Sequence, residues 1–274
     1  MVTLREDLSK KLTKKKLSFL KTSYDIIGDI AILEIPKELT EKEKMIAEEL
    51  MKLNKNVKVV CKKAGIHLGE YRLQKLKIIA GESRKTTIYK ENNVKIKINP
   101  EKVYFSVRLS TERKRIYQLV KEGESILVMF SGSGIYPVVI SKNTKAGEIY
   151  GIEINPYAHK IALENLEFNK IKNVKLFKGD VRKVIPKLKK KFDRILMPLP
   201  KGAENFLETT FIAAKKGTLI HFYDFAREKE FEERKKKVIN ICKKLGKKIK
   251  ILNLVKCGQY APFTYRICID FKVL

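Results

Sequence analysis

A regular alternation of strand-like and helix-like segments from Ser125 to Gly246 limits the fold of this chain more than any other feature. Short runs rich in Ile, Leu, Val and Phe alternate with longer segments in which apolar residues recur at helical spacing. The expected strands are residues 125–130, 148–154, 174–180, 192–200 and 217–225, and then 249–257 and 264–273 with no helix between them. Such alternation predicts an α/β fold with a doubly wound parallel sheet, and the final pair predicts an antiparallel hairpin at its edge.

Two segments of different character precede the alternating region. Residues 1–24 are rich in lysine, and we expect one basic helix that either packs on the next domain or contacts an RNA backbone. Residues 25–102 have the pattern of a small α+β domain, with a hairpin turning at residues 91–93. The main domain is expected over residues 103–274, with a strand at 102–109 and a helix capped by Ser110 or Thr111.

The charge of the chain indicates a polyanionic partner. The sequence has 60 Lys and Arg residues against 31 Asp and Glu, a net charge of +29, and nucleic acid is the usual partner of such a surface. A lysine-rich proteome is the alternative, but that bias raises glutamate together with lysine. No apolar run approaches the ~18 residues of a membrane span, and the N-terminus lacks the apolar region of a secretory signal, so a cytoplasmic protein is expected.

The cysteines and histidines do not have the spacing of a metal site. None of the four cysteines forms a CxxC pair, and the three histidines are far apart in the sequence. We therefore expect no metal, and we interpret the thiols as small buried hydrophobic groups in a monomeric protein.

Ligands of an open α/β sheet bind at the carboxyl ends of its strands, and four of the expected strand ends are distinctive. The first is followed by the glycine turn FSGSG, residues 130–134, where the backbone can approach a ligand. The second ends in Glu153, placed to accept hydrogen bonds from a ribose, and the third in Asp180, placed to accept from an adenine amino group. The fourth ends in MPLPK, residues 197–201. The combination predicts a cofactor that contains a nucleoside, although either acid could instead cap the helix that follows it.

Five strand–helix units followed by a hairpin are the plan of class I S-adenosylmethionine methyltransferases, so we expect this Rossmann-like sheet and this cofactor. Within that class the chain resembles the archaeal and eukaryotic tRNA (guanine-N1)-methyltransferases, which methylate the guanosine 3′ of the anticodon. The resemblance rests on VYFSVRLSTER, FSGSG, YGIEINPYA, GDVR and MPLPK, in that family's order and spacing, and on SYDIIGDIAIL and GEYRLQKLKIIAGESRKTTIYKENN in its middle domain. The MPLPK loop is similar to that of the archaeal dual-function branch, which also methylates carbon 7 of the wyosine precursor 4-demethylwyosine.

The resemblance implies roles for individual residues. Glu112 matches the general base that removes the N1 proton of guanine, Arg72 matches an arginine that stabilises charge on O6, and Pro198 lies near the target base. Cofactor contacts are implied for Tyr104, Phe105, Arg113, Ser131, Gly132, Gly134, Glu153, Ile154, Asp180, Val181 and Pro198. Contacts with the anticodon stem-loop of tRNA are implied for Arg72, Arg108, Arg115 and Lys201. The resemblance also implies that the small α+β domain over residues 25–102 binds tRNA. The alternatives are that Glu112 pairs with Arg108, Lys114 or Arg115 and that Arg72 is an exposed charge.

The sequence departs from the family pattern at three places. Val128 stands where the first strand usually carries an acid, Pro198 replaces a common asparagine, and the chain begins where the family's second domain begins. Two other functions are therefore kept open. One is the aminocarboxypropyl transfer of the wyosine pathway, which uses the same cofactor, and the other is tRNA binding with a vestigial cofactor pocket.

Overall fold

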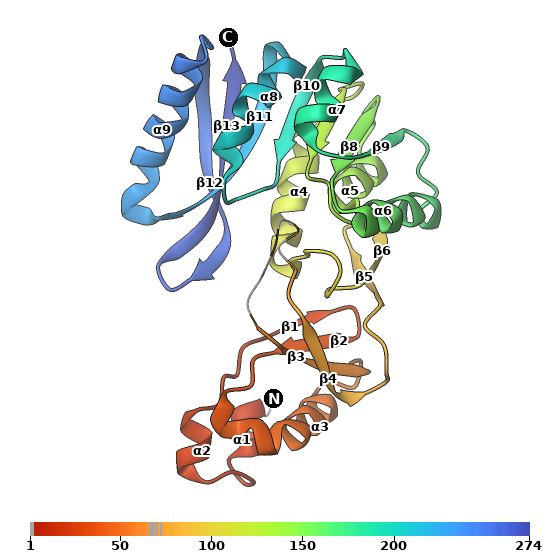
Figure 1. The fold of residues 1–274 in the computed structure, drawn as a ribbon, viewed down its shortest axis with the longest axis vertical. Coiled ribbons are helices and arrows are strands. Elements are labelled where there is room, and N and C mark those ends of the chain that lie inside the picture. Colours follow the sequence, from red (N-terminus) through yellow and green to blue (C-terminus); the bar gives the residue numbers. More distant parts are fainter. Residues whose placement is uncertain (1–2, 66–68, 70, 72) are drawn as a thin grey trace. The chain divides into compact units, whose positions relative to one another are not determined.

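The computed structural model describes residues 3–65, 69, 71 and 73–274, and the chain forms two compact units (Figure 1). The first comprises residues 1–90 and 95–107, and the second comprises residues 91–94 and 108–274. The division after Val107 falls later than the expected one. Residues 102–109 are all described and contain the 3-10 helix η2 (Val107–Leu109) instead of the predicted strand. The backbone N–H groups of Lys102 and Val103 both donate to the carbonyl of Asn99, so this turn uses amides that a strand would need for pairing.

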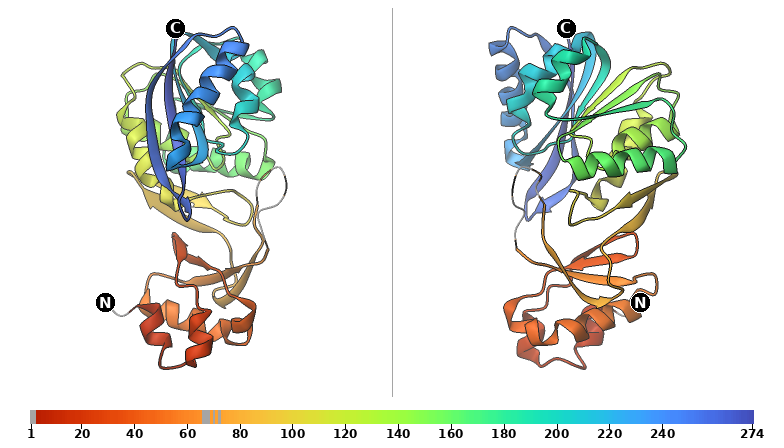
Figure 2. Two further views of the ribbon diagram at one scale, coloured as in Figure 1. Left: turned by 90° about the vertical axis from the view of Figure 1, so that its left-hand side faces the viewer. Right: turned by 45° about the vertical axis from the view of Figure 1, so that its right-hand side comes forward.

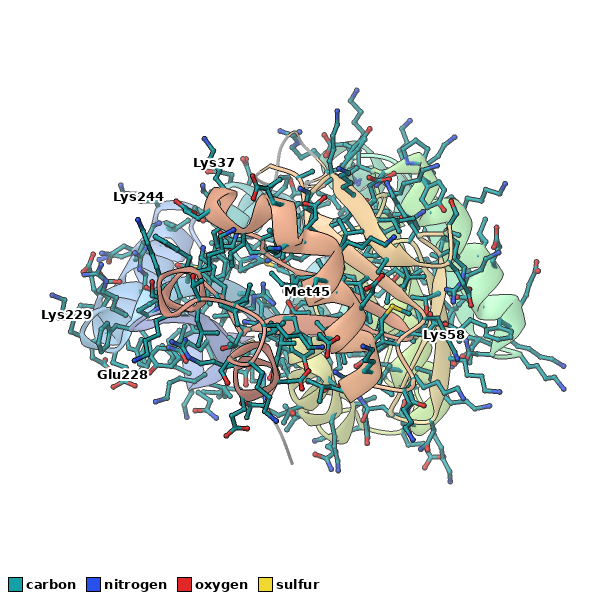
Figure 3. All side chains as sticks on the ribbon, turned by 90° about the horizontal axis from the view of Figure 1, so that it is seen from below. Lys37, Met45, Lys58, Glu228, Lys229 and Lys244 are labelled. Atoms are coloured by element: carbon teal, nitrogen blue, oxygen red, sulfur yellow. The ribbon has the colours of Figure 1, made fainter. Side chains whose placement is uncertain are left out.

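In the part of the chain that the structure describes, the first unit combines a four-stranded sheet and a two-stranded hairpin with short helices. Its elements are α1 (Leu4–Leu8), α2 (Lys14–Ser18), β1 (Tyr24–Ile27), β2 (Ile30–Leu33), η1 (Lys37–Lys42), α3 (Glu43–Leu53), β3 (Val59–Lys63), β4 (Leu76–Gly81), β5 (Thr87–Glu91) and β6 (Val94–Ile98). Strands β1 to β4 are neighbours in chain order, and β5 and β6 form the expected hairpin, whose tip at residues 91–94 is assigned to the second unit. Figure 3, viewed from below, labels Lys37, Met45 and Lys58 on this unit.

The described residues 3–24 contain two short α-helices, α1 and α2, and the prediction of one basic helix is wrong. The side chains of Thr3 and Thr13 each accept a backbone hydrogen bond at the start of α1 and α2, so each threonine begins a separate helix. The turn between the helices lets Leu4, Leu8, Leu12 and Leu20 join one core with α3. The packing role considered for this segment is therefore observed, and its contact with an RNA backbone stays a prediction.

The second unit contains the alternating elements. These are α4 (Ser110–Gln118), β7 (Ile126–Met129), α5 (Ile135–Asn143), β8 (Ile149–Glu153), α6 (Pro156–Phe168), β9 (Val174–Lys178), α7 (Val181–Leu188), β10 (Phe192–Met197), η3 (Ala203–Phe206), α8 (Leu207–Ala213), β11 (Ala214–Arg227), η4 (Glu228–Glu230), α9 (Phe231–Lys244), β12 (Ile249–Ala261) and β13 (Thr264–Val273). The sheet order is β12-β13-β11-β10-β7-β8-β9, with β7 to β11 parallel and β13 antiparallel to both of its neighbours. The predicted sheet and terminal hairpin are confirmed.

Helices cover both faces of this sheet (Figure 2). Side chains of α7, α8 and α9 join one face in a large core that includes Ile195, Ile220 and Phe271. On the other side α4 and α6 both contact α5. The cysteines Cys61, Cys242, Cys257 and Cys268 are all buried and free, as interpreted from the sequence. Among the residues described, no helix combines the length and the apolar character needed to cross a bilayer.

Candidate active site at the carboxyl edge of the sheet

The sheet brings the four distinctive strand ends to one edge. Strands β10, β7, β8 and β9 are parallel and adjacent in that order, so the segments that follow them lie side by side. We call these segments the sheet rim: residues 198–201 after β10, 130–134 after β7, 153–155 at the end of β8, and 179–180 after β9. The glycine turn, Glu153, Asp180 and the MPLPK loop, which were predicted from the sequence, therefore lie at the same edge of the sheet.

The glycine turn after β7 leads directly into α5. Phe130, Gly132 and Gly134 all have left-handed φ angles, of 57°, 56° and 79°, and Gly134 caps α5. A Cβ atom on Gly134 would lie 3.1 Å from the Cβ of Ala162, so the glycine also allows the turn to pack closely on α6. Val128, where the family pattern carries an acid, is fully buried within β7.

Glu153 is fixed by the backbone of the rim. Its two carboxylate oxygens accept hydrogen bonds from the N–H groups of Gly132 (2.7 Å) and Asn155 (2.8 Å), and the residue is 9% exposed. Burial raises the pKa of this carboxyl, while the backbone donors oppose the rise. The alternative that Glu153 caps α6 does not hold, because the side chain of Asn155 accepts the hydrogen bonds at that helix start.

Two serine hydroxyls at the glycine turn suit a polar ligand. The Oγ atoms of Ser131 and Ser133 are buried, and neither has a hydrogen-bond partner among the described residues. Buried hydroxyls are normally bonded, so these two are suited to donors or acceptors of a bound molecule. A Cβ atom on Gly151 would lie 2.6 Å from Leu176 and 3.1 Å from the Ser131 hydroxyl, so this glycine makes room for the serine. Ser133 was not predicted, because a serine between glycines has no distinguishing sequence signal.

The side chain of Asp180 caps α7, which is the alternative role considered for this residue in the sequence. Its carboxylate accepts from the N–H of Arg182 at 2.9 Å and from the guanidinium of the same residue at 2.6 Å. The bond from Arg182 holds the pKa of Asp180 below its ordinary value. The Arg182 guanidinium also lies 5.4 Å from the ring of Phe206, which packs edge-on against Phe130. Sequence reasoning missed Arg182 and Phe206, since only the fold brings η3 beside the glycine turn.

The rim after β10 is a tight turn. Leu199 lies between Pro198 and Pro200, and its N–H donates to the carbonyl of Met197 at 2.7 Å. Pro198 is half-buried and Lys201 is exposed. Ile154 is half-buried in the β8 segment, and Val181 is buried at the start of α7.

Glu112, the predicted base, is buried on α4 and pairs with a neighbouring cation. Arg115 donates to both of its oxygens, at 2.7 and 2.8 Å, and the hydroxyl of Tyr223 on β11 donates to it at 2.7 Å. The third nitrogen of the Arg115 guanidinium donates to Asp270 at 2.7 Å. This geometry disfavours the predicted RNA contact of Arg115, because its charge is directed inward to two carboxylates.

The polar network continues from Asp270 on β13 to the neighbouring strands β11 and β10. The Nδ1–H of His221 donates to Asp270 at 2.6 Å, and Arg194 donates to His221 Nε2 at 2.7 Å, which fixes the neutral tautomer. His221, Cys268 and Asp270 have ligand-type atoms within 4.8 Å of one another, as in a metal site. Two guanidinium groups already bond to the imidazole and the carboxylate, however, so their charges would repel a cation at this position.

The buried imidazole predicts a pH dependence of stability. Burial lowers the pKa of His221, despite the opposing bond to Asp270, so the unfolded chain takes up a proton first as the pH falls. We expect the free energy of unfolding to decrease as the pH falls below about 6.5, with a slope approaching about 1.4 kcal/mol per pH unit.

Urea unfolding at several pH values tests this expectation, and His221→Gln should remove most of the slope. His159→Gln is the comparison, because burial also lowers the pKa of that half-buried histidine, and its replacement should therefore remove only a smaller part of the slope. An unchanged slope in His221→Gln would contradict the assignment.

The remaining predicted residues are placed as follows. Arg113 is buried on α4 and donates through Nε and Nη2 to both oxygens of Glu91. Arg108 is exposed. Tyr104 and Phe105 belong to the first unit, where Phe105 packs edge-on against Tyr89. Arg72 lies outside the described residues, so its predicted role stays a prediction.

The sheet order, the terminal hairpin and the rim define a class I S-adenosylmethionine-dependent methyltransferase. The family model described as the TRM5/TYW2 methyltransferase domain matches residues 87–252, and the model described as the TYW2 N-terminal domain matches residues 4–85. The chain therefore belongs to the TRM5/TYW2 methyltransferase family.

Named relatives cover most of the chain. The tRNA (guanine(37)-N(1))-methyltransferase Trm5b of Pyrococcus abyssi is 41% identical over 93% of this chain and 76% of its own length. The tRNA (guanine(37)-N(1))/4-demethylwyosine(37)-methyltransferase Taw22 of Nanoarchaeum equitans is 36% identical over 92% of this chain and 100% of its own. Among solved structures, the complex of aTrm5 with tRNALeu aligns with a TM-score of 0.87 and 33% identity, over 100% of this chain and 78% of that one. The family resemblance expected from the motifs is confirmed.

Proposed function

We propose that this protein is an S-adenosylmethionine-dependent methyltransferase that modifies the purine 3′ of the anticodon in tRNA. Its product would be methylated at guanine N1, at carbon 7 of 4-demethylwyosine, or at both. The observation that carries the proposal is the sheet rim, where the buried carboxylate of Glu153 lies beside two buried hydroxyls that have no partner among the described residues. The family relatives that are named tRNA methyltransferases support the same activity.

The residues of the rim suit the parts of the cofactor. Glu153 would accept from the ribose hydroxyls, and Ser131, Ser133 and the glycine turn would bind the part of the cofactor nearest β7. S-adenosylmethionine supplies a methyl group on a sulfonium, which needs alignment with the acceptor but no activation. Asp180 would reach an adenine amino group only with the oxygen lone pairs that Arg182 leaves available.

The acceptor atom sets the demands on the other residues. Guanine N1 carries a proton, so Glu112 would accept that proton as methylation proceeds, and Arg72 would stabilise the charge that develops on O6. Arg115 and Tyr223 keep the Glu112 carboxylate in one orientation. Methylation of a ring carbon should depend less on Glu112 and more on positioning by the loop at Pro198. Arg108, Lys201 and residues 25–102 would contribute tRNA contacts, in a protein that acts as a cytoplasmic monomer.

Two substrates test the function directly. The protein is incubated with labelled S-adenosylmethionine and either unmodified tRNA or tRNA that carries 4-demethylwyosine, and the product nucleosides are identified by mass spectrometry. We expect a gain of one methyl group in at least one substrate. A gain of an aminocarboxypropyl group would instead establish the rival transferase, and no transfer together with no cofactor binding would establish a vestigial site.

Loss of the Glu153 carboxylate should weaken cofactor binding. A charged acceptor contributes about 1.5–3 kcal/mol per hydrogen bond, so Glu153→Ala should lower the affinity for S-adenosylmethionine by at least tenfold in calorimetry. The control is Glu148→Ala, because Glu148 directly precedes β8, at the opposite end of the same strand. Equal affinities of wild type and Glu153→Ala would refute the ribose assignment.

A further inference from the structure

The β12–β13 hairpin extends beyond the sheet rim. Strand β10 ends at Met197, which pairs with Phe222 of β11, but β11 continues to Arg227. The five residues of β11 beyond this pair, 223–227, span roughly 16 Å at 3.3 Å per residue. Strand β13 accompanies β11 over this length, since Arg227 pairs with Thr264, and β12 pairs with β13 up to the tip (Figure 1). The second unit therefore has a three-stranded projection on the same edge as its candidate site.

The tip of this projection carries an exposed aromatic residue in an unfavourable backbone conformation. Pro262 and Phe263 form the turn, and Phe263 has a φ of 58° and is 78% exposed. Glycine is the usual residue at such a position, because a Cβ atom there costs about 1–2 kcal/mol. Neither burial nor local geometry explains a phenylalanine here, so the ring is more useful for binding than for stability.

Phe263 forms one wall of a groove of about 430 Å³. The other lining residues are Arg227, Glu228, Lys229 and Tyr265. Lys256 pairs with Glu228 at 2.8 Å and so balances the one acidic group. Arg227 and Lys229 are exposed, and in the described part of the chain neither pairs with a carboxylate. Figure 3 labels Glu228 and Lys229, which lie in η4 directly after β11.

We propose that this groove binds an RNA nucleotide near the modified purine, with its base stacked on Phe263 and its phosphate paired with Arg227 and Lys229. Planar aromatic walls beside free cations suit a base and its phosphate, and the net charge of +29 favours a polyanion over a protein or an uncharged ligand. The position also fits, because Tyr223, which bonds to Glu112, lies four residues before Arg227 on β11, or roughly 13 Å. That distance corresponds to about four stacked nucleotides. The identification of this RNA as tRNA rests on the proposed function.

The variant Phe263→Gly separates binding from stability. Glycine removes the ring and relieves the left-handed strain, so the melting temperature should stay the same or rise. The affinity for an anticodon stem-loop RNA, measured by fluorescence anisotropy, should fall between about five- and a hundredfold. Phe263→Tyr should restore it, and Arg227→Gln should lower the slope of log Kd against log salt concentration by about 0.7–0.9. The affinity for S-adenosylmethionine should not change in any of the three.

Phe168→Ala is the matched control, because Phe168 is 47% exposed at the end of α6, away from the rim. It should bind the RNA as wild type does. An affinity of Phe263→Gly within twofold of wild type would overturn the groove, and so would a wild-type protein that binds no RNA. If the wild type binds the stem-loop but transfers no methyl group to any substrate, the proposed function fails while the comparison of affinities still decides the groove.

Discussion

Replacement of Glu112 by glutamine should lower the rate of guanine N1 methylation by about 10²–10⁴-fold, the usual contribution of a positioned general base. Glutamine keeps the size of the side chain, and its one oxygen can still accept from Arg115 and Tyr223, although its NH2 group cannot accept the second bond from Arg115. It cannot take up the N1 proton. Single-turnover rates with saturating cofactor measure this effect, and the affinity for S-adenosylmethionine should be unaffected. On the 4-demethylwyosine substrate the loss should be smaller, since carbon methylation does not begin with that proton.

Glu91→Gln is the appropriate control for this variant. Glu91 is another buried carboxylate that an arginine of α4 holds by two hydrogen bonds, in this case Arg113. If loss of a buried ion pair were the whole effect, the two variants would be slowed alike. An unchanged rate in Glu112→Gln, or an equal loss in both variants, would show that Glu112 is a structural residue.

Removal of Asp270 should have the largest effect on stability. Asp270 accepts hydrogen bonds from Arg115 and from His221. In Asp270→Ala the guanidinium of Arg115 loses one of its two carboxylate partners, and the Nδ1–H of His221 loses its acceptor. Breaking a buried pair in this way costs about 3–5 kcal/mol of the free energy of unfolding, which urea denaturation at pH 7 measures.

The pH dependence of the same residue gives an independent check. Burial alone would raise the pKa of Asp270, but the bonds from His221 and Arg115 hold it well below its ordinary value. The stabilisation is therefore present above about pH 4, the unfolded value, and is lost as the pH falls further. Asp270→Asn should lack this acid-dependent loss.

Asp224→Asn is the control, because burial raises the pKa of Asp224 and its ionised form therefore does not stabilise the fold. This variant should be as stable as wild type or slightly more stable. Equal destabilisation by Asp270→Asn and Asp224→Asn would contradict the role given to the buried network.

Local patterns in the sequence predicted the elements of the second unit well. Apolar runs such as residues 126–129 and 149–153 became β7 and β8, because buried strands must be apolar on both faces of a covered sheet. The same patterns failed at residues 102–109, where a turn at Asn99 uses the backbone amides. They also failed at residues 1–24, where the apolar spacing of one helix is divided by a second threonine cap.

The sequence predicted those residues of the candidate site that lie at the ends of strands. A carboxylate at the end of a strand, or within two residues of that end, must lie at the sheet edge, so Glu153 and Asp180 could be placed in advance. Their partners could not, because Asn155 rather than Glu153 caps α6, and Arg182 rather than a ligand bonds to Asp180 in this structure. Tyr223, Asp270 and His221 gave no signal, since they become neighbours of Glu112 only through the pairing of β11 with β13.

The sequence alone determined the class of fold and the family, since alternating periodicity and short motifs are properties of neighbouring residues. It also determined that the protein carries a large excess of positive charge. Only the tertiary structure decided which charges are available to a partner. Arg115 and Arg113 form ion pairs with buried carboxylates. Arg227 and Lys229, in contrast, lie at the surface beside Phe263. The physical reason is that the partner of a side chain is fixed by long-range strand pairing and helix packing, which join residues more than a hundred positions apart, such as Glu112 and Tyr223.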